Sequence, residues 1–262
     1  MSQKKVRLDR LLVERELVAS RAQGQALILA GAVAVNGRTI TQAGTLVAAD
    51  AQLALKERPP YASRGGQKLA AGLDNFGLAV EGRICADVGA STGGFTDVLL
   101  QRGAERVYAI DVGYGQLDWR LRQEPRVVVM ERVNARHLES LPAPIGLATV
   151  DVSFISLRLI LPAVKSWLAP VADVVALIKP QFEAGRAQVG RGGVVRDPAV
   201  HRLVLSELLA WFPEAGLYPQ ALRRSPVTGP AGNVEFLAWL RQKPAAHFDP
   251  ERQLAAVLEQ SA

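Results

Sequence analysis

A glycine-rich stretch at residues 87–97 constrains the fold of this chain more than any other feature. It reads Asp-Val-Gly-Ala-Ser-Thr-Gly-Gly-Phe-Thr-Asp and follows an apolar run that begins at Arg83. Apolar residues at helical spacing come next, from Phe95 to Leu100. Glycine permits positive φ angles and a close approach of the backbone to a ligand, and the first amide groups of a helix point outward. The stretch therefore predicts a buried strand, a ligand-binding turn and a helix.

Beyond Arg83 the sequence alternates between short apolar runs and amphipathic segments. This alternation is typical of a doubly wound α/β fold, in which helices cover both faces of a mostly parallel sheet. We predict a seven-stranded Rossmann-like sheet. Strands are expected at 83–88, 106–110, 126–130, 146–151, 171–178, 217–224 and 233–240, and helices at 69–76, 94–102, 156–168, 198–212 and 249–260.

The first quarter of the chain differs from the remainder in charge and in pattern. Residues 1–64 contain ten Lys and Arg residues against five Asp and Glu, which favours binding of a polyanion. Two short helices are expected, followed by a hairpin at Asn36-Gly37, a dipeptide strongly preferred in tight hairpin turns. We expect a small α+β domain at 1–58, a linker at 59–64 and the α/β domain at 65–262.

The spacing of the glycines indicates which nucleotide-like ligand the turn binds. A dinucleotide fingerprint reads G-x-G-x-x-G, whereas here three residues separate Gly89 from the pair that follows. The pattern resembles the first motif of methyltransferases that use S-adenosylmethionine (SAM), a cation that an acid beside the turn can balance. An acid about 20 residues past the turn suits ribose hydroxyls. The expected SAM-binding residues are Asp87, Gly89, Ala90, Ser91, Thr92, Gly93, Gly94, Phe95, Asp111 and, for the adenine, Asn134.

Four further charged residues stand at predicted strand ends or helix starts: Lys68, Asp151, Lys179 and Glu235. Charges at such positions are costly unless they are paired. Two explanations stay open at this point. The four residues form structural ion pairs, or they form a cluster that activates a hydroxyl group.

The whole chain resembles the TlyA (haemolysin A-like) family of ribosomal RNA 2′-O-methyltransferases, and its first part resembles the S4 RNA-binding domain. The S4 likeness rests on Arg7-Leu-Asp-Arg-Leu-Leu, on Ser20-Arg21 and on residues 26–37. The likeness to the methyltransferases rests on residues 63–69, 87–96, 111–117, 151–157, 177–183, 192–195 and 229–235.

This resemblance implies an FtsJ-like, SAM-dependent catalytic domain that acts on ribosomal RNA or ribosomal subunits, at a cytidine ribose. It implies that Lys68, Asp151, Lys179 and Glu235 form a catalytic tetrad. A ribose hydroxyl is a poor nucleophile at neutral pH and needs a base, and our hypothesis assigns that role to Lys179. The resemblance also implies phosphate contacts by arginine, whose planar fork suits phosphate oxygens. The candidate RNA-binding residues are Arg7, Arg10, Arg21, Arg38 and Arg64.

Several features limit the class of protein. No secretory signal and no apolar run of ~20 residues are present, so we expect a cytoplasmic protein without a membrane span. The single cysteine, Cys85, lies in an apolar run and is expected in the core. The three histidines, His137, His201 and His247, are scattered, so we expect them at the surface or in loops and expect no metal site.

Competing functions remain to be distinguished. An amino-methyltransferase would be expected to have two prolines and an aromatic residue after the acid of the fourth strand, where this chain has Asp151-Val-Ser-Phe154. A reductase is disfavoured by the glycine spacing. The family name raises a membrane-active haemolysin, and an RNA-binding assembly factor without essential catalysis is a further alternative.

Overall fold

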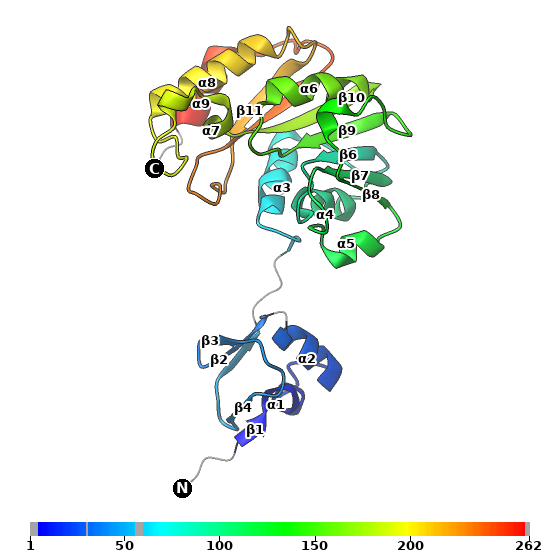
Figure 1. The fold of residues 1–262 in the computed structure, drawn as a ribbon, viewed down its shortest axis with the longest axis vertical. Helices are drawn as coiled ribbons and strands as arrows, with labels where there is room; N and C mark the ends of the chain where they lie inside the picture. The colour runs from blue at the N-terminus through cyan, green and yellow to red at the C-terminus, as the bar shows by residue number, and fades with distance from the viewer. Residues whose placement is uncertain (1–4, 30, 56–59, 260–262) are drawn as a thin grey trace. The chain divides into compact units, whose positions relative to one another are not determined.

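The computed structural model of the chain describes residues 5–29, 31–55 and 60–259 (Figure 1). The chain divides into two compact units, residues 1–60 and residues 61–262. The start of the predicted linker, at Pro59, and the last residue of the predicted closing helix, at 260, lie outside the described residues.

The smaller unit is an α+β domain with two small antiparallel sheets. One sheet pairs β1 with β4, and the other has the order β3-β2-β5. The hairpin is confirmed, because Asn36 and Gly37 both have positive φ angles, 49° and 79°, as the favoured two-residue turn requires. Strands β1 and β4 were not predicted. The elements are β1 (Lys5–Arg7), α1 (Leu8–Glu14), α2 (Arg21–Leu29), β2 (Val33–Val35), β3 (Arg38–Ile40), β4 (Leu46–Ala48) and β5 (Leu53–Leu55).

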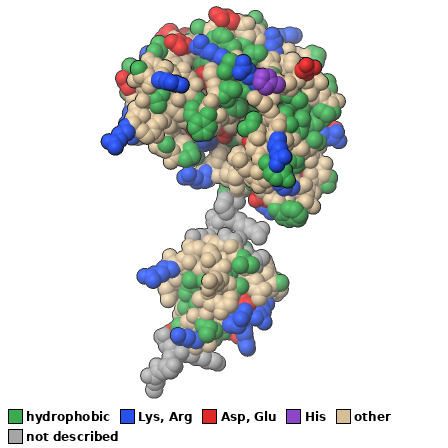
Figure 2. All heavy atoms as spheres, viewed as in Figure 1, with side chains coloured by type: hydrophobic (Ala, Val, Ile, Leu, Met, Phe, Trp, Pro, Cys, Tyr) green, Lys and Arg blue, Asp and Glu red, His purple; other side chains and the backbone are tan. Residues whose placement is uncertain are grey.

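A buried carboxylate, Asp9, organises the polar side of this unit. Asp9 is fully buried and accepts hydrogen bonds from Arg7 at 2.9 and 3.1 Å, from Arg21 at 3.0 Å and from Gln25 at 2.8 Å. The hydrogen bond from Arg7 holds the pKa of Asp9 well below its usual range, although burial acts in the opposite direction. The guanidinium groups of Arg7 and Arg21 stay partly exposed, so Asp9 fixes their position while they remain accessible to solvent. Figure 2 shows blue Lys and Arg side chains on the visible face of this unit.

Replacing Asp9 by alanine is expected to destabilise the smaller unit by about 1–3 kcal/mol, because three donors lose their shared acceptor. Hydrogen exchange of the backbone amides of residues 5–55, measured on the full chain, reports this change. Glu14→Ala is the matched control, since its ion pair with Arg10 is exposed and is worth well under about 1 kcal/mol. Equal exchange in the two variants would contradict the assignment.

The larger unit confirms the predicted seven-stranded, mostly parallel sheet. Its strand order is β11-β12-β10-β9-β6-β7-β8, in which β12 is antiparallel to both of its neighbours and the other pairs are parallel. The strands are β6 (Ile84–Val88), β7 (Arg106–Asp111), β8 (Val127–Glu131), β9 (Ile145–Val150), β10 (Leu168–Ile178), β11 (Tyr218–Arg224) and β12 (Phe236–Arg241).

Helices cover both faces of this sheet. The predicted closing helix is capped by Asp249, whose carboxylate accepts from the backbone N–H of Arg252. The short helices α5 and α7 were not predicted, and β10 begins three residues earlier than expected. The helices are α3 (Gly65–Phe76), α4 (Gly94–Gln101), α5 (Trp119–Gln123), α6 (Leu157–Ser166), α7 (Pro180–Glu183), α8 (Pro198–Trp211) and α9 (Pro250–Glu259).

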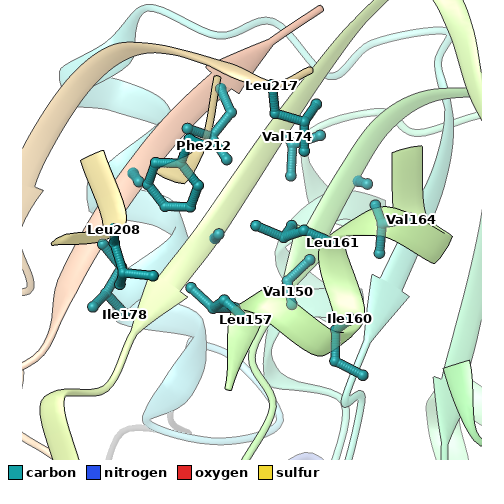
Figure 3. Packing of buried hydrophobic residues seen from close by; sticks show 14 of the residues in the cluster. Val150, Leu157, Ile160, Leu161, Val164, Val174, Ile178, Leu208, Phe212 and Leu217 are labelled. Carbon is teal, nitrogen blue, oxygen red and sulfur yellow. The ribbon is translucent and has the colours of Figure 1, made fainter. Parts of the chain in front are cut away.

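The alternation of side chains along each strand divides the core into two layers. On β6, Ala86 and Val88 belong to the layer under α6, α8 and α9, whereas Cys85 belongs to the layer under α3 and α4. Figure 3 shows part of the first layer, where Leu157 and Leu161 of α6 pack near Val150 and Val174 of the sheet. Cys85 is buried as predicted, and burial raises the pKa of its thiol to about 12.

The location of His201 differs from the prediction. It was predicted at the surface or in a loop, but it is buried on α8, where Nε2 lies 3.1 Å from the carbonyl oxygen of Val195 and the ring packs edge-on against Phe236. Burial lowers the pKa of His201.

Residues 61–64 were predicted as part of the linker, and they contact the larger unit. The side chains of Tyr61 and Ala62 pack on the layer under α3 and α4, and the backbone N–H of Ala62 donates to Asp97 at 2.8 Å. Among the described residues, no helix is long and apolar enough to cross a bilayer.

Candidate active site

The candidate site lies at the carboxyl ends of the parallel strands, where the strand order reverses between β6 and β9. Ligands of open α/β sheets bind at such a switch point. The end of β6 leads into the glycine turn, β7 ends in Asp111, and Asp151 and Lys179 directly follow β9 and β10. Three adjoining hollows meet there, and Gly89, Ser91 and Asp151 line all of them.

The glycine turn brings the backbone of β6 against the loop after β9. Gly89 and Gly93 have φ angles of 86° and 91°, which favour glycine, and Ser91 is also in this region at 47°. A Cβ atom on Gly89 would collide with the carbonyl oxygen of Asp151. The turn therefore requires glycine here for both its conformation and its packing.

We call the widest of the three spaces the main hollow. It has a volume of about 460 Å³, within the range of small-molecule sites. Its lining is mostly apolar, with a few polar groups at the strand ends. The lining residues are Val88, Gly89, Ser91, Ile110, Asp111, Val112, Gln116, Val133, Asn134, Ala135, Asp151, Val152, Ser153, Phe154, Ile155 and Ile160.

Asp111 and Asn134 both line the main hollow, as expected of residues that contact an adenosine group. The carboxylate of Asp111 accepts from the backbone N–H of Ser91 at 2.8 Å and from that of Gly113 at 2.6 Å. Asn134 caps a short 3₁₀ helix, with its side-chain oxygen 3.1 Å from the N–H of Arg136. Both side chains are thereby held in place at the rim.

The other expected SAM-binding residues fall into two groups. Ala90, Thr92, Gly94 and Phe95 line the turn hollow, a space of about 110 Å³ that also includes Ser63 and Gly65. Gly93 and Asp87 line none of the three hollows. Gly93 packs under the side chains of Leu117 and Leu121.

Asp87 lies behind the turn. It is fully buried and accepts hydrogen bonds from the hydroxyls of Thr96 at 2.7 Å and Thr149 at 3.1 Å. Burial raises the pKa of Asp87 to about 7; the bond from Thr96 opposes this, and the nearby charge of Asp151 adds to it. The structure thus places Asp87 where it supports the turn from within the core.

This burial predicts a pH dependence of stability. The folded protein retains the Asp87 proton up to about pH 7, whereas an unfolded aspartate loses it near 3.8, so this contribution to stability is lost as the pH rises between these values. Asparagine does not titrate, so Asp87→Asn should lack that loss. We expect the Tm of the variant to rise by several degrees relative to wild type between about pH 5 and about pH 8. Parallel thermal-unfolding profiles would contradict this.

The four charged residues of the tetrad meet in one space, the tetrad hollow, of about 310 Å³. Lys68 of α3 pairs with Glu235 just before β12, and the Lys179 Nζ lies 2.6 Å from Asp151 Oδ1. Burial raises the pKa of Glu235, and the hydrogen bond from Lys68 opposes that change. The tetrad therefore forms two ion pairs, and both line the same hollow. The hollow also includes Ser63, Arg64, Gly65, Gly89, Ser91, Ser153, Val227, Thr228 and Pro230.

Two residues beside the site, Phe154 in the loop after β9 and Glu183 in α7, were not among the predicted site residues. Phe154 has a φ angle of 64° and is 90% exposed, with its ring 5.0 Å from that of Phe182. A bulky residue held in this conformation is strained, a feature that often marks functional sites. Glu183 accepts from the hydroxyl of Ser156 at 2.6 Å and from the N–H of Leu157 at 2.8 Å, which ties α7 to the start of α6.

The candidate RNA-binding arginines lie in both units. Arg7 and Arg21 share the carboxylate of Asp9, Arg10 pairs with Glu14 and Arg38 is exposed on β3. Arg64 belongs to the larger unit and lines the tetrad hollow. The structure therefore brings Arg7 and Arg21 together and places Arg64 beside the tetrad.

Comparison with known protein families shows that the larger unit is a methyltransferase. The model of the FtsJ-like methyltransferase family matches residues 61–242, and the model of the S4 domain matches residues 6–53. This chain belongs to the FtsJ-like methyltransferases and, among them, to the TlyA family.

Three relatives illustrate this membership. The 16S/23S rRNA (cytidine-2′-O)-methyltransferase TlyA of Mycobacterium tuberculosis is 46% identical over 243 residues, which cover 91% of this chain and 90% of that protein. Hemolysin A of Brachyspira hyodysenteriae is 39% identical, over 89% of this chain and 98% of that protein. A solved structure from Streptococcus thermophilus has a TM-score of 0.75 and 43% identity, covering 99% of this chain and 96% of that one.

Proposed function

We propose that this protein transfers a methyl group from SAM to the 2′-hydroxyl of a cytidine ribose in ribosomal RNA. The observation that carries the proposal is the tetrad hollow, in which two lysines and two carboxylates face one space beside the main hollow. The similarity of this chain to an enzyme whose name states cytidine 2′-O-methylation supports the proposed choice of substrate.

The residues of the main hollow fit SAM. Its volume suits a ligand of that size, its apolar walls from β7 and the following loops suit an adenine ring, and Asp111 stands where a ribose would lie. SAM supplies, when bound, a methyl group on a positively charged sulfur. The residues we propose for its binding are Asp111, Asn134 and the glycine turn at 89–95, with Asp87 supporting the turn from behind.

The tetrad supplies the base that a ribose hydroxyl needs. Lys179 accepts the hydroxyl proton as the general base, and Asp151, 2.6 Å away, stabilises the ammonium group that forms. The Lys68–Glu235 pair lines the same hollow, and its ion pair holds the two side chains in place. Together these groups remove a proton at one defined position.

Contacts to RNA are proposed for both units. Arg7 and Arg21, anchored by Asp9, suit phosphate oxygens, with Arg10 and Arg38 as further candidates on the S4 domain. Arg64 stands beside the tetrad, where the target nucleotide enters. The exposed ring of Phe154 offers a face on which an unstacked base can rest.

Mass spectrometry of ribosomal RNA tests the proposal. RNA from a bacterial host without a related enzyme is compared before and after expression of this protein, and new 2′-O-methylcytidine is expected only in the second sample. Purified subunits and naked RNA, each incubated with labelled SAM, identify the form of the substrate. Methylation of a base nitrogen, or no new methyl group, would reject the proposal.

A further inference from the structure

The hydroxyl of Ser153 contacts the proposed base directly. Ser153 Oγ accepts a hydrogen bond from Lys179 Nζ at 2.9 Å. Asp151 Oδ1 lies closer to the same nitrogen, at 2.6 Å, but this contact is not aligned as a hydrogen bond. Within the described part of the chain, Ser153 is the side chain that accepts an aligned hydrogen bond from Lys179.

We propose that Ser153 is a positioning residue for this reaction and that its hydroxyl sets the orientation of the Lys179 amine. The inference rests on the proposed function, in which Lys179 is the base. A neutral amine has two N–H bonds and one lone pair. When one N–H is directed at Ser153 and the other points toward the Asp151 carboxylate, the lone pair is left for the incoming ribose hydroxyl. The attraction of the Asp151 carboxylate alone does not select this orientation, because Coulomb attraction depends weakly on angle.

The place of Ser153 in the fold supports this role. Ser153 lines both the main hollow and the tetrad hollow, so it stands at the boundary between the proposed methyl donor and the acceptor. Groups that orient a reacting atom need rigid support.

The loop that carries Ser153 is anchored on both sides. Before it, the N–H of Asp151 donates to the carbonyl oxygen of Val88 at 2.9 Å, and Gly89 packs closely against the Asp151 backbone. After it, Glu183 accepts from Ser156 and Leu157. The hydroxyl is therefore presented from a fixed backbone, although the Ser153 side chain is exposed.

Kinetics of Ser153→Ala test the proposal. The variant keeps the Lys179–Asp151 ion pair but loses the directed hydrogen bond. We expect kcat to fall about tenfold with KM for RNA and for SAM unchanged, because misorientation of the base affects the transition state and not substrate binding. Ser153→Thr keeps a hydroxyl and is expected to retain kcat within about threefold of wild type.

Matched variants make the result decisive. Ser166→Ala removes a serine hydroxyl that bonds to Ala163 at the end of α6, away from the hollows, and should leave kcat unchanged. A wild-type kcat in Ser153→Ala, a rise in KM alone, or equal losses in the alanine and threonine variants would overturn the role of Ser153. Lys179→Ala, assayed in parallel, separates the two proposals. Its activity would reject the proposed base itself, whereas its inactivity beside a fully active Ser153→Ala would reject only the present inference.

Discussion

Replacing Lys179 by alanine is expected to abolish methyl transfer while leaving SAM binding intact. A general base contributes typically about 10²–10⁴-fold to rate. Among the described residues that line the tetrad hollow, the other amine belongs to Lys68, which is paired with Glu235. SAM binding should survive because Lys179 lines the tetrad hollow and not the main hollow. Single-turnover transfer of labelled methyl measures the first effect, and titration calorimetry with SAM measures the second.

Two further variants identify what Lys179 supplies. Lys179→Arg keeps the positive charge, but a guanidinium group does not lose its proton at neutral pH, so this variant should be as inactive as alanine. Lys243→Ala removes an exposed lysine that lines neither the main hollow nor the tetrad hollow, and it serves as the control with full activity. Activity in Lys179→Arg would show that the residue acts through its charge, and the assignment as base would fail.

Breaking the Lys68–Glu235 ion pair is expected to have the largest effect on stability. The two side chains are 8% and 1% exposed, so either charge left alone is buried without a partner. Removing one member of such a pair typically costs about 3–5 kcal/mol. We expect Lys68→Ala to lower the free energy of unfolding by this amount, measured by urea titration with tryptophan fluorescence. All four tryptophans of the chain lie in the larger unit, so the signal reports on that unit.

Removing both charges separates stability from catalysis. The double variant Lys68→Met, Glu235→Leu should recover most of the lost stability, because apolar side chains replace buried ions at little or no cost. It should still fail to transfer methyl groups if the pair is part of the catalytic tetrad. Asp74→Ala breaks the exposed pair with Arg102 and should cost no more than about 1 kcal/mol. A stable and active double variant would make the pair purely structural.

Much of the architecture could be predicted because it depends on local patterns. Most of the seven strands follow from apolar runs that the sheet buries, and the glycine turn follows from glycines that tolerate positive φ angles. The hairpin at Asn36-Gly37 has the same origin. By contrast, β1, β4 and α5 are three to five residues long, too short for a periodic pattern to identify them.

The pairing and exposure of side chains could not be predicted in the same way. The sequence around Asp87 does not indicate whether this residue contacts a ligand or lies buried behind the turn. Its buried position includes a hydrogen bond from Thr149, which belongs to another strand. His201 is buried on α8, where Phe236 reaches its ring from the distant strand β12 and the carbonyl oxygen of Val195 contacts Nε2. The exposure of Phe154 depends on a backbone conformation that its sequence neighbours do not require.

The sequence by itself determined the composition of the candidate site: a glycine turn that demands its backbone conformation, Asp111 at the tip of the next strand, and four charged residues at predicted element ends. These are properties of short segments, so they can be read in order along the chain. Only the tertiary structure decided which side chains pair with each other. Lys68 and Glu235 are 167 positions apart, and they meet because α3 and the approach to β12 pack at the same edge of the sheet. Ser153 lies beside Lys179 for the same reason, because β9 and β10 are parallel and the segments that follow them lie at the same edge of the sheet.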